Sequence, residues 1–281
     1  MRLQQEGRSR EVTALFARRM KYNFAATFVA MLLGGVIAQF YLPAGWALFT
    51  VLSLAGVFVG LQLKESSAVE RTGSARPQSA GRHLLSGLRT IRDSTALAAT
   101  LLLLLIGNIA YEGVDQFWQI YAEESRGIAV LWFGAATGIA ALILFFSAGP
   151  VTRWLEERLG YKNGISLLVL AAAVFLTLFA LLGGVVAVLG CFVLFSVLRN
   201  LQEPLITGYV SDHSPSQTRA TVLSTNNLIC SAGEMIAALG LGWLAGAVGL
   251  QPLFLVAAVL LVGGGALFYR VFGRRRETGL I

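Results

Sequence analysis

Residues 64–93 read KESSAVERTGSARPQSAGRHLLSGLRTIRD, a long interval in which polar residues outnumber apolar ones. Serine, glycine and arginine are frequent, and Pro77 lies near the middle, so we predict a flexible linker over the first two thirds. Between Leu84 and Arg92, leucine and isoleucine recur at helical spacing against arginine. This spacing predicts a short amphipathic helix that lies on a membrane surface.

Apolar segments of membrane-spanning length flank this interval on both sides. Two precede it, 24–40 and 46–63, with a tight turn predicted at Pro43 and Gly45. Six follow it: 95–121, 130–148, 165–182, 185–201, 221–248 and 253–271. Helices are expected because an open strand edge in lipid would leave backbone groups without hydrogen-bond partners. The sequence therefore predicts an all-α polytopic membrane protein with eight transmembrane helices, divided into 1–63, the linker 64–93, and a six-helix region 94–281.

The composition supports the same class. Of the 281 residues, 56% are hydrophobic and only 13% are charged, and the mean hydropathy is +0.70, which excludes a soluble domain of this size. Cys191 and Cys230 fall inside apolar segments, so we expect free, buried thiols. We find no pattern for a metal site, a phosphate-binding loop or an activated nucleophile, so we predict no cofactor and no enzyme.

Basic residues indicate the orientation. All but two of the 22 Lys and Arg residues lie at the two ends of the chain, in the linker, or in the gaps that share their side of the membrane. The exceptions are Arg126, in an opposite gap, and Arg199, within a helix. By the positive-inside rule, both termini, the linker and the basic gaps face the cytoplasm. The net charge of +7 therefore marks a membrane face and does not indicate nucleic-acid binding.

A polar stripe runs along the third predicted helix. Asn108, Glu112, Asp115 and Gln119 follow one another at intervals of three or four residues, which places them on one face. A carboxylate inside a membrane costs a few kcal/mol, about 2.5–3.5 on insertion scales, so it normally lines a water-filled cavity or finds a partner. Coupling to substrate or proton is one interpretation. The alternative is that these groups lie solvated at the outer mouth or pair with Arg126.

Two later helices also carry polar groups. In the sixth, Arg199 and Glu203 are four residues apart, a spacing that allows an ion pair with a structural or gating role. In the seventh, Asn227, Ser231 and Glu234 share one face. Glu234 is predicted to lie near mid-membrane, where a charge is most costly, so we consider it a candidate for proton exchange or for contact with a cationic group.

The arrangement of two helices, a linker and six helices resembles the major facilitator superfamily, whose members have two six-helix halves joined by a long cytoplasmic loop. The gap GPVTRWLEERLGYK, 149–162, resembles a basic loop signature of the family through Glu157, Arg158, Gly160 and Lys162. The segment 199–228 is similar to one found in bacterial drug-efflux-like members. Gly34 and Gly35 fall where antiporters of the family end a glycine-proline motif, but the earlier positions of that motif differ here.

This resemblance implies that the chain corresponds to helices 5 to 12 of the twelve, with the first four of the N-terminal half missing. It also implies secondary active transport of small organic molecules, as efflux, by alternating access around a central site. The expected partners are the lipid bilayer, a small-molecule substrate, a proton as coupling ion and the missing N-terminal half, without which we expect the chain to be inactive. The alternative function is that of a membrane assembly or scaffold partner that does not transport.

Overall fold

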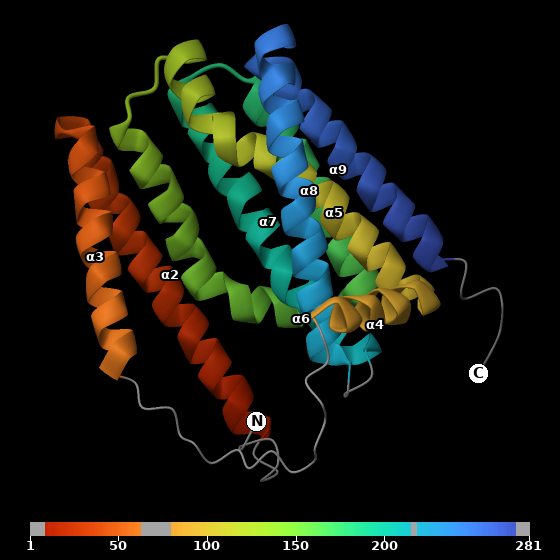
Figure 1. The fold of residues 1–281 in the computed structure, drawn as a ribbon. Helices are drawn as coiled ribbons and strands as arrows, with labels where there is room; N and C mark the ends of the chain where they lie inside the picture. The colour runs from red at the N-terminus through yellow and green to blue at the C-terminus, as the bar shows by residue number, and fades with distance from the viewer. Residues whose placement is uncertain (1–8, 63–79, 215–217, 274–281) are drawn as a thin grey trace.

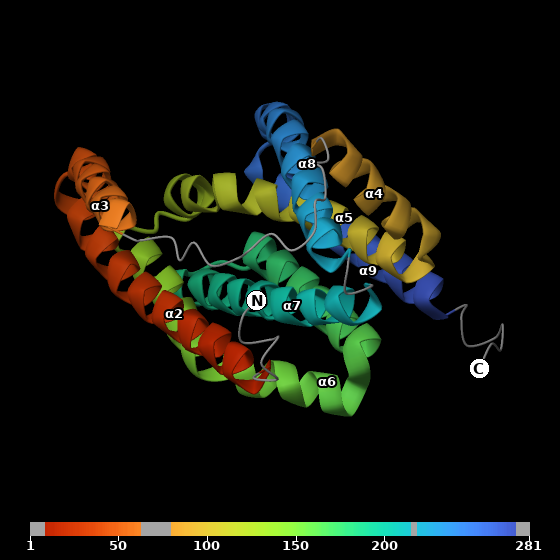
Figure 2. The same cartoon turned by 60° about the horizontal axis from the view of Figure 1, so that its bottom comes forward.

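The computed structural model describes residues 9–62, 80–214 and 218–273, and these residues contain helices but no strand. This confirms the all-α class. The helices are α2 (Ser9–Phe40), α3 (Leu42–Gln62), α4 (Ala80–Asp93), α5 (Thr95–Ile120), α6 (Leu131–Leu181), α7 (Val185–His213), α8 (Arg219–Val248) and α9 (Leu250–Gly273), and a π-helical turn η1 (Tyr121–Ser125) follows α5. In both views they form a bundle, with α2 and α3 at one side (Figures 1 and 2).

Seven of these helices are long and apolar enough to cross a membrane, and α4 is not among them. The 51 residues of α6 cover two of the predicted spans, 130–148 and 165–182, except for their outermost residues Val130 and Leu182. At about 1.5 Å per residue, α6 is more than twice as long as the ~30 Å hydrocarbon layer is thick. Gly160, at φ +69° and ψ 168°, interrupts the helix between the two spans. A positive φ favours glycine, which explains the residue type at this bend.

Two turns separate neighbouring helices. Gly183 and Gly184 lie between α6 and α7, and Gly184 has a φ of +86°. The turn between α2 and α3 lies at Tyr41, so its prediction at Pro43 and Gly45 was wrong. Pro43 belongs to the first turn of α3, where proline is tolerated because the backbone N–H groups there lack intrahelical acceptors.

The core lies among α5, α6, α7 and α9. Near one end of the bundle, the rings of Tyr121, Phe179 and Phe254 contact one another with centroids 5.1–5.4 Å apart, which joins η1, α6 and α9. Trp118 of α5 stacks on Phe192 of α7 at 3.8 Å. Such aromatic pairs add about 0.5–1.5 kcal/mol to simple burial. The six-helix region therefore has a continuous core of its own.

The two helices before the linker pack differently. α2 lies along α6, and α3 contacts α2 at the edge of the bundle (Figure 1). Where α2 meets α6, a Cβ atom on Gly35 would lie only 3.1 Å from the Cα atom of Gly134, so the two backbones approach as closely as glycine allows. None of the residues in the apolar span of α3 is buried.

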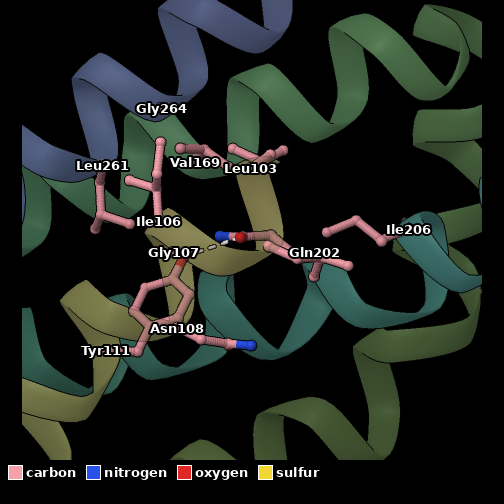
Figure 3. Close-up of a pocket in the computed structure, with 11 residues that line it drawn as sticks. Leu103, Ile106, Gly107, Asn108, Tyr111, Val169, Gln202, Ile206, Leu261 and Gly264 are labelled. Carbon is pink, nitrogen blue, oxygen red and sulfur yellow. Dashed lines mark hydrogen bonds between the residues drawn. The ribbon is translucent and has the colours of Figure 1, made fainter. Parts of the chain in front are cut away.

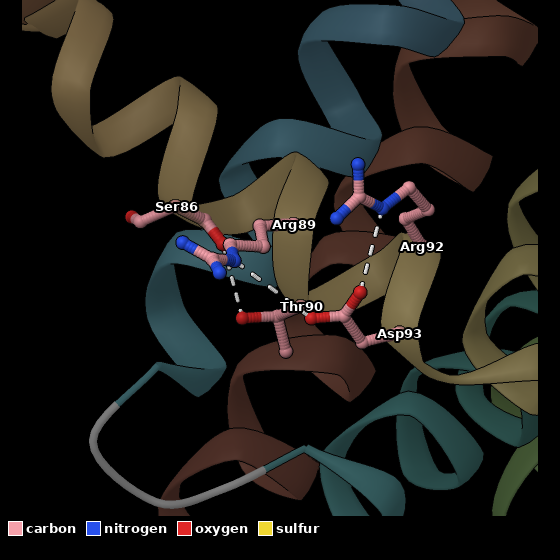
Figure 4. A network of polar contacts seen from close by, with 5 residues as sticks. All are labelled: Ser86, Arg89, Thr90, Arg92 and Asp93. Atoms are coloured by element: carbon pink, nitrogen blue, oxygen red, sulfur yellow. Dashed lines mark hydrogen bonds and ion pairs between the residues drawn. The ribbon is translucent and has the colours of Figure 1, made fainter.

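Helix α4 runs across the ends of the other helices and lies at the margin of the bundle beside α8 (Figures 1 and 2). Gly87 faces Thr225 of α8, and Ile91 is buried, whereas Leu85 is exposed. Arg89 and Arg92 both lie close to the carboxylate of Asp93, at 4.0 and 3.4 Å (Figure 4). The predicted amphipathic helix is confirmed as a helix, and its place on a membrane surface stays a prediction. Most of the predicted linker, from 64 to 79, lies outside the described residues.

Candidate functional site

The polar stripe of α5 runs from a half-buried position to the surface. Asn108 and Glu112 are half-buried, and Asp115 and Gln119 are exposed. Gln116, beside the stripe, donates a hydrogen bond from Nε2 to Glu112 Oε1 at 2.8 Å. The stripe therefore carries two carboxylates, one held by a neighbouring amide and the other open to a partner from another helix.

That partner is Arg199. Its Nη1 lies 2.6 Å from Asp115 Oδ1, and its guanidinium lies over the ring of Tyr111, 4.5 Å from the centroid. The predicted pairing of Arg199 with Glu203 was wrong, because among the described residues the carboxylate bound to Arg199 comes from α5, and Glu203 is exposed. Asp115 lies opposite Arg199 across the helix pair, and the resulting charge-assisted hydrogen bond is short and direct. The contact joins α5 to α7.

A second polar contact lies beside this ion pair. Tyr111 donates a hydrogen bond to Gln202 Oε1 at 2.9 Å, and both side chains are buried (Figure 3). Gln202 Nε2 has no hydrogen-bond partner among the described residues, and the amide borders a cavity of about 20 Å³ that Asn108 also lines. A volume of ~10–15 Å³ is enough for one water molecule. The cavity therefore has the size and a donor suited to an ordered water.

Tyr111 and Gln202 were missed in the sequence analysis. Tyr111 lies four residues before Asp115, and Gln202 lies three residues after Arg199, so both extend the polar faces of their helices. Because tyrosine is common in apolar cores, the sequence did not mark Tyr111 as a polar residue of the site. A glutamine inside an apolar helix, three residues from an arginine, could have indicated the second.

The α8 residues approach the stripe from another side. Asn227 and Ser231 are exposed, and Glu234 is half-buried. Asn108 of α5 lies within hydrogen-bonding reach of the Cys230 thiol, and Glu234 lies near the same thiol. Cys191 and Cys230 are buried free thiols, as predicted. The structure thus brings Glu234 of α8 near Asn108, at the start of the α5 stripe.

Arg126 does not pair with the stripe. Its Nη2 donates to Tyr121 Oη at 2.5 Å and to the carbonyl oxygen of Ala180 at 2.9 Å. The alternative that Arg126 neutralises Glu112 or Asp115 was therefore wrong. The arginine is held instead at the junction of η1 with the end of α6, where helix-terminal carbonyl groups lack intrahelical partners.

A cleft of about 390 Å³ opens between α2, α5 and α6. Gln119, the last residue of the α5 stripe, lines it together with Thr137 of α6. Met31 and Gly35 of α2 line it from the other side. The cleft is therefore shared by the helices before and after the linker, and its volume lies within the ~300–1,000 Å³ typical of small-molecule pockets.

The loop signature forms the bend of α6. Glu157 and Arg158 are exposed, Gly160 supplies the positive φ, and Lys162 Nζ lies over the ring of Tyr269 in α9, 3.8 Å from the centroid. Because no described ion pair includes any of the four, the signature contributes backbone geometry and a cation–π contact between α6 and α9.

Tyr161, inside the signature, joins α6 to α7. Its hydroxyl lies 2.8 Å from Glu156 Oε1 and 3.0 Å from Asp212 Oδ2. Burial raises the pKa of Tyr161, and its hydrogen bonds to the two carboxylates raise this pKa further, so the hydroxyl remains a donor.

Comparison with known proteins agrees with this architecture. A sequence model of the Major Facilitator Superfamily matches residues 9–238 and 154–279. The chain belongs to this superfamily. YxaM, an uncharacterized MFS-type transporter of Bacillus subtilis (strain 168), is 22% identical over 262 residues, which cover 88% of this chain and 63% of YxaM. The MFS chain is thus an integral membrane protein of a transporter family, and the family evidence argues against an enzyme.

Proposed function

We propose that this MFS chain supplies the last two helices of the N-terminal half and the whole C-terminal half of a secondary active transporter. The transporter exports small organic molecules across the bacterial inner membrane by alternating access, with both termini in the cytoplasm. The observation that carries the proposal is the Asp115–Arg199 ion pair. Asp115 belongs to the polar stripe of α5, and Gln119, the last residue of that stripe, lines the cleft between α2, α5 and α6.

The ion pair suits a site that changes state. The Asp115 side chain is 49% exposed and that of Arg199 is 29% exposed, so the pair is open on one side. A cationic substrate or a proton at Asp115 would compete with Arg199, and release of the guanidinium would weaken the contact between α5 and α7. A ligand that favours one arrangement of these helices shifts the equilibrium between the two.

Glu234 is the second candidate for coupling. It is half-buried in α8, close to the beginning of the α5 stripe. A carboxylate at this depth is stable when protonated or when it meets a cation, and these are the two states that proton-coupled exchange requires. We assign Glu234 and Asp115 to the coupling ion, and Asn108, Glu112, Gln119, Asn227 and Ser231 to contact with substrate.

One observation favours the alternative function as a membrane assembly partner. None of the residues in the apolar span of α3 is buried, and only 17% of those in α8 are. Helices with such large uncovered faces can serve as docking surfaces for another membrane protein. The same faces are also what a half-transporter would present to its missing helices, so transport has to be measured.

The test uses proteoliposomes with two proteins, the 281-residue chain alone and the chain fused to the part of YxaM that lies outside their match. We expect substrate-dependent flux of organic cations only from the fused protein. Asp115→Asn or Glu234→Gln should lower the flux about tenfold, the scale of a typical coupling free energy. Asp93→Asn, the same change on the surface helix α4, is the matched control and should leave the flux unchanged.

The outcomes separate the parts of the proposal. Flux by the chain alone would show that it needs no further helices. Flux that both variants retain would reject the site. If the fused protein moves none of a panel of organic cations, anions and neutral amphiphiles, and the chain instead co-purifies with another membrane protein, the assembly role is supported. Exchanging the charges, Asp115→Arg with Arg199→Asp, should restore more flux than either single change leaves.

A further inference from the structure

A groove of about 360 Å³ lies between the second half of α6 and α9, on a side that neither α5 nor α8 lines. Its walls are apolar: Leu167 and Leu170 of α6, and Val262 and Ala266 of α9. The two leucines and Val262 are 46–52% exposed, so the walls face outward rather than into the core. The groove is therefore separate from the polar stripe of α5.

Glycine accounts for the depth of this groove. A Cβ atom on Gly265 would lie 3.2 Å from Val169, so α9 approaches α6 closely and the floor carries no side chain there. Because Gly265 carries no side chain, the space between the flanking leucine and valine side chains stays open.

The groove is polar at only one end. Tyr269 and Arg270 lie at the C-terminal end of α9, and Lys162 rests on the ring of Tyr269. Ser166 Oγ, in the same lining, is buried and has no hydrogen-bond partner among the described residues. Among those residues, neither Lys162 nor Arg270 forms an ion pair with a carboxylate. An anion at this end would thus meet two cations and a hydroxyl donor.

We propose that this groove binds an anionic phospholipid, with an acyl chain between Leu167 and Ala266 and the phosphate at Lys162 and Arg270. The polar end of the groove lies at the same end of the bundle as α4 (Figure 1), an amphipathic helix whose arginines suit the level of lipid headgroups. Long basic side chains reach headgroups while their stems stay in the apolar layer. Neutral or cationic solutes would not use this pair of cations, which distinguishes the groove from the substrate cleft.

The test is photolabelling of the full chain in nanodiscs with phosphatidylglycerol or phosphatidylcholine that carries a diazirine in the acyl chain. Mass spectrometry then locates the labelled peptides. We expect phosphatidylglycerol to label the peptides that contain Leu167–Leu170 and Val262–Ala266. Lys162→Gln with Arg270→Gln should reduce the preference for phosphatidylglycerol roughly twenty-five-fold, because each basic residue near an anionic surface contributes about fivefold. Arg89→Gln with Arg92→Gln, two cations of α4 outside the groove, should keep the labelling of these peptides.

A second variant tests the shape of the groove. Ala266→Trp fills it and should abolish the labelling, whereas Val259→Trp, on an exposed position of α9 outside the groove, should not. Size-exclusion chromatography and circular dichroism confirm that each variant is folded. Equal labelling by the two lipids, labelling that survives Ala266→Trp, or displacement of the label by an organic cation but not by unlabelled phosphatidylglycerol would each overturn the proposal.

Discussion

Helices α3 and α5 are both apolar enough to cross a membrane, yet they differ completely in packing. Half of the residues in the apolar span of α5 are buried within the protein, whereas none of those in α3 is. α3 is the more apolar of the two. Hydropathy therefore places a helix in lipid but does not decide whether it joins a core. The difference arises from specific contacts: α5 has Trp118, Tyr111 and Asp115 facing partners on α7, and α3 has no such residue in its span.

This difference follows from the solvent. Lipid chains are as apolar as leucine, so two helices gain little by exchanging lipid for each other unless they pack closely or form polar contacts. The six-helix region does both. Its aromatic rings pack against one another, and its polar side chains form contacts between helices. In contrast, α2 meets this region along α6, where Gly35 faces Gly134, and α3 contacts α2.

The largest expected effect is the difference in stability loss between removing a large side chain from the core and removing one from α3. Phe179→Ala, in the aromatic cluster, should lower the free energy of unfolding by roughly 3–5 kcal/mol, because it leaves a cavity among Tyr121, Phe192 and Phe254. Phe49→Ala, on the exposed surface of α3, should change it by less than about 0.5 kcal/mol. Unfolding of the full chain in mixed micelles measures both. Equal losses would show that α3 is packed as tightly as the core.

A smaller effect is expected at the contact that joins the two regions. Gly35→Leu places a side chain against Gly134 and should separate α2 from α6, whereas Gly34→Leu, the adjacent residue with open space around it, should not. The readout is oxidative cross-linking between Leu32→Cys on α2 and Gly138→Cys on α6, which lie in contact. We expect the cross-link to fall several-fold only with Gly35→Leu, since overpacking costs about 1–3 kcal/mol. Equal yields with both leucines would mean that the glycine contact does not hold α2.

The smallest effect concerns the α6–α7 joint of the well-packed region. Tyr161→Phe removes the hydroxyl that lies between Glu156 and Asp212 and should cost about 1 kcal/mol at neutral pH. Because the pKa of Tyr161 is raised in the folded state, its contribution is complete below the ordinary tyrosine value of 10.0 and is lost as the pH rises above it.

The measurement is the free energy of unfolding between pH 8 and 11. The wild type should lose stability more steeply than Tyr161→Phe above about pH 10, so the two curves approach each other. Glu156→Gln, which keeps an acceptor near Tyr161 but removes one charge, is the control and should weaken the alkaline loss. Parallel curves for the wild type and Tyr161→Phe would contradict the assigned contacts.

Much of the fold could be predicted from the sequence, because membrane helices are identified by local apolar length. The starts of α5 at Thr95 and of α7 at Val185 agree with the predicted spans. The continuity of α6 could not be predicted, since the charged residues among 149–162 interrupt the apolar pattern and indicate a loop between two spans. The helical backbone on both sides of Gly160 is visible only in the structure.

The site was predicted less completely. Helical spacing placed Asn108, Glu112, Asp115 and Gln119 on one stripe, and this geometry is local. The predicted partner of Arg199 was wrong because sequence spacing favours Glu203, four residues away. Asp115 lies 84 residues away in the sequence and meets Arg199 only through the packing of α5 on α7. Spacing along one helix identifies the partner of a charged residue only when no residue of a second helix binds it instead.

The contacts around Ala180 have one more consequence. Its carbonyl oxygen, at the end of α6, accepts hydrogen bonds from Tyr121 Oη, Arg126 Nη2 and Gln251 Nε2 at 2.7–3.1 Å. Three donors from η1, the following loop and α9 thus share one acceptor that has two lone pairs. The three hydrogen bonds are therefore redundant. When any one of the donors is absent, the other two still saturate the oxygen and keep this end of the bundle closed.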